Sequence, residues 1–141
     1  ETNLFSAFEL SRFAFPLLSQ HASSSIVNVG SVSGLTHVRT GAPYGMTKAA
    51  LHQLSRMLAR ELVGAHINVN VIAPGRFPSK MTQHIGNDEQ ALAQDTALIP
   101  MKRWGREEEM AALAISLAST AGAYMTGQTL HINGGLSNSG V

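Results

Sequence analysis

Residues 25–34 read SIVNVGSVSG, and this stretch decides the class of fold. A short run rich in β-branched residues, Ile26 to Val29, stops at Gly30-Ser31. Such a run, bounded by glycine and serine, is typical of a strand. A serine directly after a strand of an open α/β sheet lies at the sheet's carboxyl edge, where these folds bind ligands. The stretch therefore predicts an α/β protein in which the Ser31 hydroxyl faces a ligand crevice.

A tyrosine and a lysine follow in residues 42–50, APYGMTKAA, with Tyr44 thirteen residues after Ser31. Side chains four residues apart lie on one face of a helix, so the Lys48 ammonium favours the phenolate form of Tyr44. Such a phenol can protonate a developing alkoxide or deprotonate an alcohol. Taken alone, the pair is usually a solvated lysine stem lying along a ring. Its place after Ser31 favours a catalytic role.

The patterns along the chain predict three strands and three main helices without internal repeats. The first helix runs from about Leu4 to Gln20; its apolar residues face more than one side, so we expect it to be largely buried, and to be bent or weakened late by Pro16. The other predicted elements are a strand over 25–29, a helix over 43–63 and a strand over 66–73 that Pro74-Gly75 breaks.

Residues 80–100 are polar, rich in alanine and weakly patterned, with one possible short helix over 88–96. We predict a mobile lid over the substrate here, and an ordinary surface insertion is the alternative. A second loop, residues 35–41, is expected to rim the site. The apolar residues of the lid either line a slot for an acyl chain or pack in the core: Met81, Ile85, Leu92, Leu98 and Ile99.

The serine, the Tyr-x-x-x-Lys pair and the stretch Asn70–Gly75 together resemble the short-chain dehydrogenase/reductase family. Asn3, 28 residues before Ser31, is similar to the family's active-site asparagine. Residues 103–110 and 126–135 look like its last helix and last strand. The resemblance covers nearly all 141 residues, and it implies the carboxyl-terminal half of a Rossmann-type doubly wound parallel sheet.

The resemblance implies a role for each matching residue. Ser31 would hydrogen-bond the carbonyl oxygen, Tyr44 would donate the proton, Lys48 would hold the nicotinamide ribose, and Asn3 would position a water that resupplies protons. Ser79 stands where threonine is usual. The residues implied to contact the cofactor, NADP(H) in preference to NAD(H), are Tyr44, Lys48, Pro74, Gly75, Phe77 and Ser79.

Within the family, residues 48–58 and 73–82 resemble 3-oxoacyl-[acyl-carrier-protein] reductases of the rhamnolipid-biosynthesis type. This implies an enzyme that reduces a ketone, a 3-oxoacyl thioester, to a secondary alcohol with NADPH. One alternative is a dehydrogenase of another alcohol or sugar. Another is an inactive truncated fragment that acts only by association. The resemblance also implies a homodimer or homotetramer.

No glycine-rich strand-turn-helix that would cradle a dinucleotide pyrophosphate occurs in the sequence. We therefore expect residues 1–141 to form a partial single domain, the catalytic half, without the amino-terminal dinucleotide-binding half. We also expect this chain alone to bind NADPH weakly or not at all.

Composition narrows the class of protein further. Hydrophobic residues make up 44% and charged residues 13%, which suits a chain that folds around a core. The net charge of +1, without a basic cluster, argues against a nucleic-acid partner. No apolar run has the length of a membrane span, and there is no cysteine for disulfides or thiol chemistry. We expect a cytoplasmic enzyme.

The six histidines lack metal-ligand spacing, so we expect no metal site; most should be surface or packing residues, and His37 is a candidate substrate contact. Ser33 is eleven residues from Tyr44 rather than thirteen, so we place it in the turn. The pattern GSVSG also resembles the nucleophile elbow of esterases, but no helix is expected to follow it, which disfavours hydrolysis. Two residues depart from the family pattern: Asn133, where aspartate is common, and Glu107, where proline is common.

Overall fold

A computed structural model describes residues 2–37 and 41–138 of the chain. Its sheet has three parallel strands in the order β1 (Ser24–Val29), β2 (Ile67–Pro74) and β3 (Thr129–Ile132). Ile26 lies opposite Val69 in the first pair of strands, and Ile72 lies opposite Leu130 in the second. The prediction of a parallel α/β sheet with three strands is confirmed.

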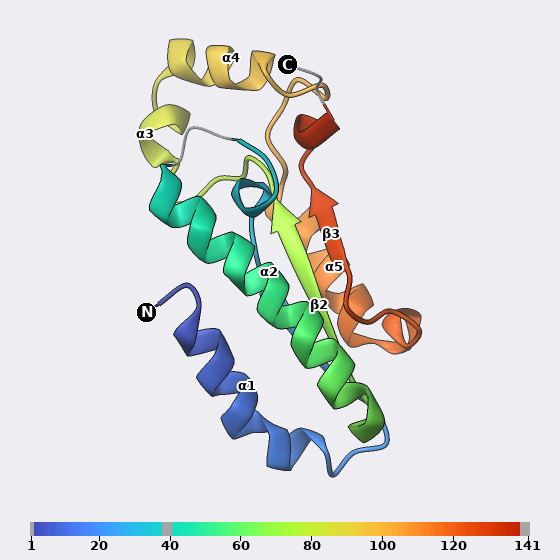
Figure 1. Cartoon of the computed structure of the whole chain (residues 1–141). Helices are drawn as coiled ribbons and strands as arrows, with labels where there is room; N and C mark the ends of the chain where they lie inside the picture. Colours follow the sequence, from blue (N-terminus) through green and yellow to red (C-terminus); the bar gives the residue numbers. More distant parts are fainter. Residues whose placement is uncertain (1, 38–40, 139–141) are drawn as a thin grey trace.

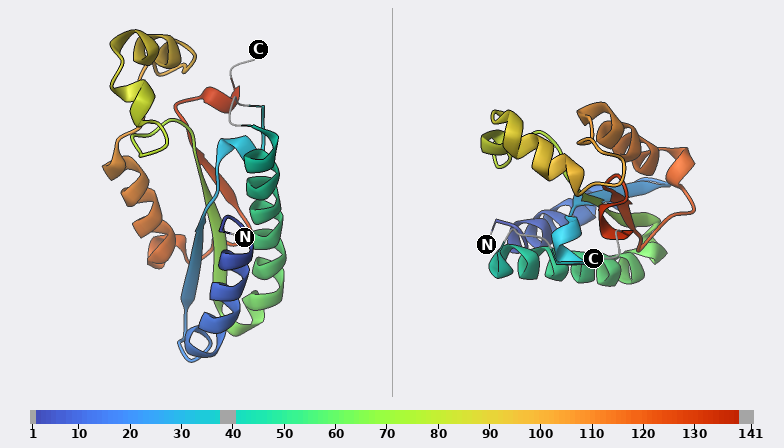
Figure 2. Two further views of the ribbon diagram at one scale, coloured as in Figure 1. Left: turned by 90° about the vertical axis from the view of Figure 1, so that its left-hand side faces the viewer. Right: turned by 90° about the horizontal axis from the view of Figure 1, so that it is seen from above.

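Helices cover both faces of this sheet (Figures 1 and 2). The helices α1 (Phe5–Leu18) and α2 (Ala42–Leu62) lie on one face, and α5 (Glu107–Ala118) lies on the other. Two shorter helices, α3 (Gln83–Gly86) and α4 (Glu89–Ala97), lie beyond the carboxyl ends of the strands. The three layers match part of a Rossmann-type fold. Within residues 80–100 the sequence predicts only the second of the short helices.

The centre of the molecule is β2, which is packed on both faces. Ile67 and Val69 are fully buried against Leu58 and Ala59 of α2. Asn70, also buried, uses both ends of its amide: Nδ2 donates to the Met125 carbonyl at 2.7 Å, and Oδ1 accepts from the Gln128 amide at 3.0 Å. Because both ends are bonded, this polar side chain fixes the connection into β3 at little cost.

The expectation that the first helix is largely buried is wrong. Phe5, Leu10, Phe13 and Leu17 are each between 63% and 68% exposed. In the chain, α1 lies beside the edge strand β1 while α2 covers β2, so only one stripe of α1, ending at Leu18, packs against the core.

The helix α1 ends two residues after Pro16, which agrees with the predicted weakening late in its course. The Gln20 side-chain amide donates to the Pro16 carbonyl at 2.8 Å and satisfies one of the last carbonyls of the helix. Across the part of the chain that the structure describes, no helix combines the length and apolar character that crossing a membrane requires.

Candidate active site

A cavity of about 250 Å³ opens at the carboxyl ends of β1 and β2. The first turns of α2 and the start of the lid complete its wall. Part of that wall is apolar, contributed by Met81, Met110 and Leu136. The structure brings most of the predicted site residues together in this wall, namely Ser31, Tyr44, Lys48, Pro74, Gly75, Phe77 and Ser79.

Ser31 lies one residue beyond the end of β1, after Gly30, and caps a single 3₁₀ turn, Val32–Gly34. Its Oγ accepts a hydrogen bond from the Ser33 amide at 3.1 Å and donates to the Ser33 hydroxyl at 3.1 Å. Its own amide donates to Nε2 of His52 at 3.3 Å. The turn therefore holds the serine in a fixed orientation at the cavity. Ser33 lies in the turn, as predicted, and an esterase elbow would need a helix in place of it.

Lys48 lies one helical turn after Tyr44 on α2. Its Nζ donates to the carbonyl oxygen of Val29, the last residue of β1, at 2.8 Å. The same Nζ lies 5.7 Å from the centroid of the Tyr44 ring. Burial lowers the pKa of Lys48 from its ordinary value. The ammonium thus joins the strand that carries Ser31 to the helix that carries the phenol.

Asn3 lies in the turn before α1, outside the residues that line the cavity. Its Nδ2 is 3.5 Å from Oγ1 of Thr47, at the limit of a hydrogen bond. The Thr47 hydroxyl in turn donates to the carbonyl of Tyr44 at 2.8 Å. The structure therefore brings Asn3 to Thr47, the residue before Lys48 in the chain, outside the lining of the cavity.

The residues after β2 form the opposite wall. The Phe77 ring is buried over Gly105, where an added Cβ would come within 2.3 Å of Cζ of the ring. The Thr82 hydroxyl donates to the Phe77 carbonyl at 2.8 Å. The same Thr82 hydroxyl lies 3.0 Å from the Ser79 hydroxyl. Phe77 therefore lines the cavity while its ring packs tightly against Gly105.

Asp95 of α4 joins the predicted lid, residues 80–100, to this wall. Oδ1 of Asp95 pairs with Nη2 of Arg76 at 3.1 Å, and Oδ2 accepts from Nε1 of Trp104 at 2.8 Å. We call this cluster, Arg76, Asp95 and Trp104, the lid latch. Of the apolar lid residues, Met81 lines the cavity, whereas Ile99 is buried in the core.

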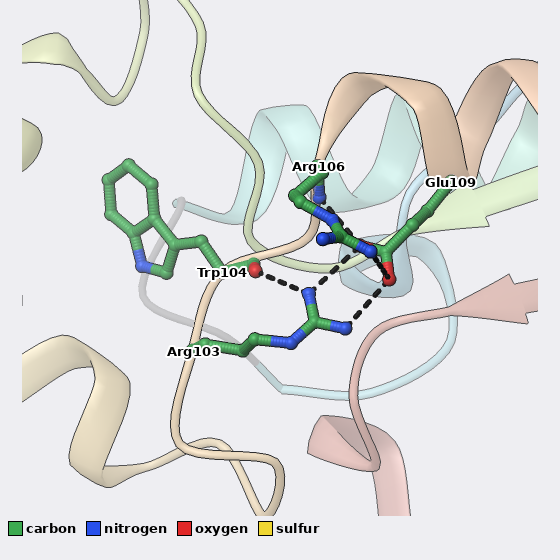
Figure 3. A network of polar contacts seen from close by, with 4 residues as sticks. All are labelled: Arg103, Trp104, Arg106 and Glu109. Atoms are coloured by element: carbon green, nitrogen blue, oxygen red, sulfur yellow. Dashed lines mark hydrogen bonds and ion pairs between the residues drawn. The ribbon is translucent and has the colours of Figure 1, made fainter.

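A second polar cluster begins α5 (Figure 3). Arg103 holds both oxygens of Glu109, at 2.7 and 2.9 Å, and donates to the Trp104 carbonyl at 3.0 Å. The Arg106 amide also donates to Glu109, at 2.7 Å. These contacts, led by the hydrogen bond from Arg103, lower the pKa of Glu109 to about 2. Glu107, the first residue of α5, places negative charge at the positive end of the helix dipole in the position where the family often has proline.

The other departure, Asn133, fits its turn. Oδ1 accepts from the Gly135 amide at 3.0 Å, as a carboxylate would, and Nδ2 donates to the Ser137 hydroxyl at 2.7 Å. Gly75 lies against this residue, because an added Cβ there would be 2.7 Å from the Asn133 Cβ. The asparagine thus ties the loop after β3 to the cavity wall.

Sequence reasoning missed one residue of the site, His52, because it was placed among the surface or packing histidines. It is buried behind Ser31. The available signal was its spacing, four residues after Lys48 and eight after Tyr44, which puts it near the same helix face. His37 is exposed, and it does not line the cavity. Among the residues that the structure describes, no three His, Cys, Asp or Glu side chains are grouped to hold a metal ion.

A family model described as enoyl-(acyl carrier protein) reductase matches residues 1–137. The chain belongs to the short-chain dehydrogenase/reductase family. One member, the rhamnolipids biosynthesis 3-oxoacyl-[acyl-carrier-protein] reductase of Pseudomonas aeruginosa, is 61% identical over an alignment of 140 residues, and the match covers 96% of this chain and 55% of the relative. The chain spans about half the length of the curated relatives it matches.

Solved structures of short-chain dehydrogenase/reductases superpose closely on the chain. The Pseudomonas aeruginosa RhlG/NADP active-site complex gives a TM-score of 0.92 at 61% identity, over 96% of this chain and 55% of that one. A gluconate 5-dehydrogenase from Burkholderia cenocepacia, in complex with NADP and tartrate, gives 0.91 at 29% identity, over 97% and 54%. The relatives therefore include proteins named for acyl thioesters and for sugar acids.

Proposed function

We propose that this chain carries the catalytic side chains of an NADP(H)-dependent reductase that converts a ketone to a secondary alcohol. One observation carries the proposal: a serine hydroxyl, a tyrosine phenol and a lysine ammonium line a single cavity at the carboxyl end of a parallel sheet. These are a hydrogen-bond donor, a proton donor and a cation, the groups that carbonyl reduction requires.

The residues act on the oxygen of the ketone. When bound, the nicotinamide supplies a hydride to the carbonyl carbon. The Ser31 hydroxyl donates a hydrogen bond to the oxygen as negative charge develops there, and the Tyr44 phenol gives this oxygen its proton. The Lys48 ammonium, held at the Val29 carbonyl, favours the phenolate that remains. Asn3 would hold a water that returns a proton through Lys48.

The donors in the cavity fit a nicotinamide ribose. Lys48 offers N–H groups and Ser79 offers a hydroxyl, and both line the cavity beside the backbone of Pro74 and Gly75. Gly75 is packed against Asn133, which leaves no room for a side chain, so Gly75 contributes only backbone atoms to the wall. Backbone N–H and C=O groups at this wall could pair with the carboxamide, which Phe77 would face. The NADP in the RhlG complex supports NADP(H) as the cofactor here.

We propose a 3-oxoacyl thioester as the ketone. The 61% identity to a 3-oxoacyl-[acyl-carrier-protein] reductase supports this class, and so does the apolar wall of Met81, Met110 and Leu136. The second candidate is a keto sugar acid. It is supported by the likeness to gluconate 5-dehydrogenase and by Arg76, a cation in the cavity wall that could pair with a carboxylate.

The chain should also self-associate, as a homodimer or homotetramer. The exposed apolar side chains of α1, together with Met57 of α2, support this proposal. Light scattering on the purified chain tests it, and a monomer at all concentrations would contradict it. An association module without catalysis would show the oligomer and no turnover. The cytoplasmic location stays a prediction, which fractionation can test.

The test of function compares two proteins: this chain, and a joined protein in which the chain follows the part of the Pseudomonas aeruginosa reductase that it does not match. NADPH oxidation is followed with a short 3-oxoacyl thioester and with 5-ketogluconate. We expect thioester-dependent turnover by the joined protein, and little NADPH binding by the chain alone. Preference for 5-ketogluconate would favour the second candidate, and a folded joined protein without turnover on either ketone would overturn the proposal.

A further inference from the structure

We propose that His52 is a positioning residue that holds the Ser31 hydroxyl in the cavity, with its neutral ring accepting the Ser31 backbone N–H. The distance from the Ser31 nitrogen to Nε2 is 3.3 Å, and the side chain is 1% exposed. His52 does not line the cavity, so its effect passes through Ser31. The expected effect on turnover rests on the proposed reductase function.

The His52 ring is wedged against the loop that carries Ser31. A Cβ added to Gly30 would lie 2.2 Å from Nε2, and one added to Gly34 would lie 2.9 Å from Cε1. At Gly30 the imidazole is the nearest obstacle to a side chain, whereas at Gly34 the backbone of α2 at Lys48 and Ala49, 2.7 Å away, lies nearer than the ring. Close approach, rather than a special backbone conformation, therefore requires glycine on each side of the serine.

The hydrogen bond fixes the tautomer of His52. Since the Ser31 amide donates to Nε2, the lone pair is on Nε2 and the proton is on Nδ1. Nδ1 is buried and has no hydrogen-bond partner among the residues that the structure describes. A buried N–H without a partner is destabilising, so an apolar side chain would suit this core better if packing were its only task. The further task of His52 is to accept the Ser31 N–H at Nε2.

A charged imidazole could not do this. With a proton on Nε2, two donors would face each other across the contact with Ser31. The charged and titratable groups around the ring also oppose a second proton: Lys48 and Arg56 lie on α2, and His131 lies on β3. Loss of the acceptor would leave the Ser31 N–H buried without a partner and free the turn 31–34 to shift.

The test uses two variants of the joined protein. His52→Gln keeps an acceptor oxygen at a similar reach, and His52→Leu keeps the volume but removes the acceptor. We expect His52→Leu to lower kcat by roughly tenfold or more, in line with a lost buried hydrogen bond, while KM for NADPH stays within about twofold. His52→Gln should restore most of kcat. Equal kcat in His52→Leu and the parent, or equal losses in both variants, would overturn the role.

A second measurement does not depend on turnover. Nitrogen-15 NMR of the histidine-labelled chain should show, at neutral pH, a ring protonated at Nδ1 only, and the Ser31 amide proton should shift in His52→Leu more than in His52→Gln. A proton on Nε2 would overturn the proposal. If the joined parent reduces no ketone, the proposed function fails while this measurement still decides whether His52 holds Ser31.

Discussion

The two walls of the cavity are held in different ways. In the wall of β1 and α2, Ser31 is buried and its amide donates to His52 behind the wall, while Lys48 donates to the Val29 carbonyl. In the opposite wall, charged pairs hold the lid and α5, with side-chain exposures of 22% and 10% for Arg76 and Asp95, and 43% and 30% for Arg103 and Glu109. Buried hydrogen bonds resist salt, whereas ion pairs are screened by it, the more exposed pair of Arg103 and Glu109 more strongly than the largely buried pair of Arg76 and Asp95. We therefore expect a rigid wall of β1 and α2, which carries the proposed catalytic side chains, and an adjustable wall on the opposite side, which would control access of the substrate.

The largest effect should come from removing the proton donor of the rigid wall. We expect Tyr44→Phe in the joined protein to lower kcat by roughly 10³-fold, because general acid catalysis contributes about that much. Steady-state NADPH oxidation measures it. The fold should be unchanged by circular dichroism, since phenylalanine keeps the half-buried ring of Tyr44 and removes only its hydroxyl. Turnover retained within tenfold would contradict the role of the phenol.

The next largest effect is the loss of stability at low pH that the buried His52 should cause. Burial, with the charges of Arg56, Lys48 and His131, lowers the pKa of His52 from 6.5 to about 4. As the pH falls, His52 is therefore protonated at a higher pH in the unfolded chain than in the folded chain. The contribution of neutral His52 to the free energy of unfolding is complete above pH 6.5 and is lost as the pH falls to about 4. The loss over this range is about 3 kcal/mol.

Urea unfolding of this chain at a series of pH values measures that loss. His52→Gln, which cannot titrate, is the matched control and should lose correspondingly less stability over the same range. Identical pH dependence in the parent and the control would contradict the buried neutral ring.

The rigid wall was also the more predictable from sequence. The run before Gly30-Ser31 and the spacing of Tyr44 and Lys48 depend on local periodicity, and the structure places all three side chains in one cavity. The lid latch could not be predicted, because Arg76, Asp95 and Trp104 meet only through tertiary packing and follow no period. The prediction that α1 is largely buried was wrong for a related reason. Apolar residues show which faces can be covered, but the covering element is set by topology, and α2 takes the centre of that face.

The third prediction concerns removal of the ion pair between Arg76 and Asp95 in the adjustable wall. We expect Asp95→Asn in the joined protein to raise KM for the ketone by roughly fivefold and to leave kcat within twofold, because the ion pair with Arg76 is lost while an acceptor for Trp104 remains. Asp88→Asn is the matched control. It removes one charge from the start of the same helix, yet asparagine caps a helix as well as aspartate does. Equal KM in the two variants would show that the latch does not control the lid.

The smallest effect should come from the exposed cluster at the start of α5. Arg103, first by its hydrogen bond, lowers the pKa of Glu109 from 4.5 to about 2. Since the folded pKa is the lower one, the contribution of Glu109 is present above pH 4.5 and is lost as the pH falls toward 2. We expect Glu109→Gln to lower Tm slightly at neutral pH, less so in high salt, and to match the parent at the acid end. Glu108→Gln, which removes a neighbouring charge of the same first turn, should have less effect. A drop in Tm that is as large in high salt as in low salt would mean that Glu109 acts through packing, and that this wall is as rigid as the other.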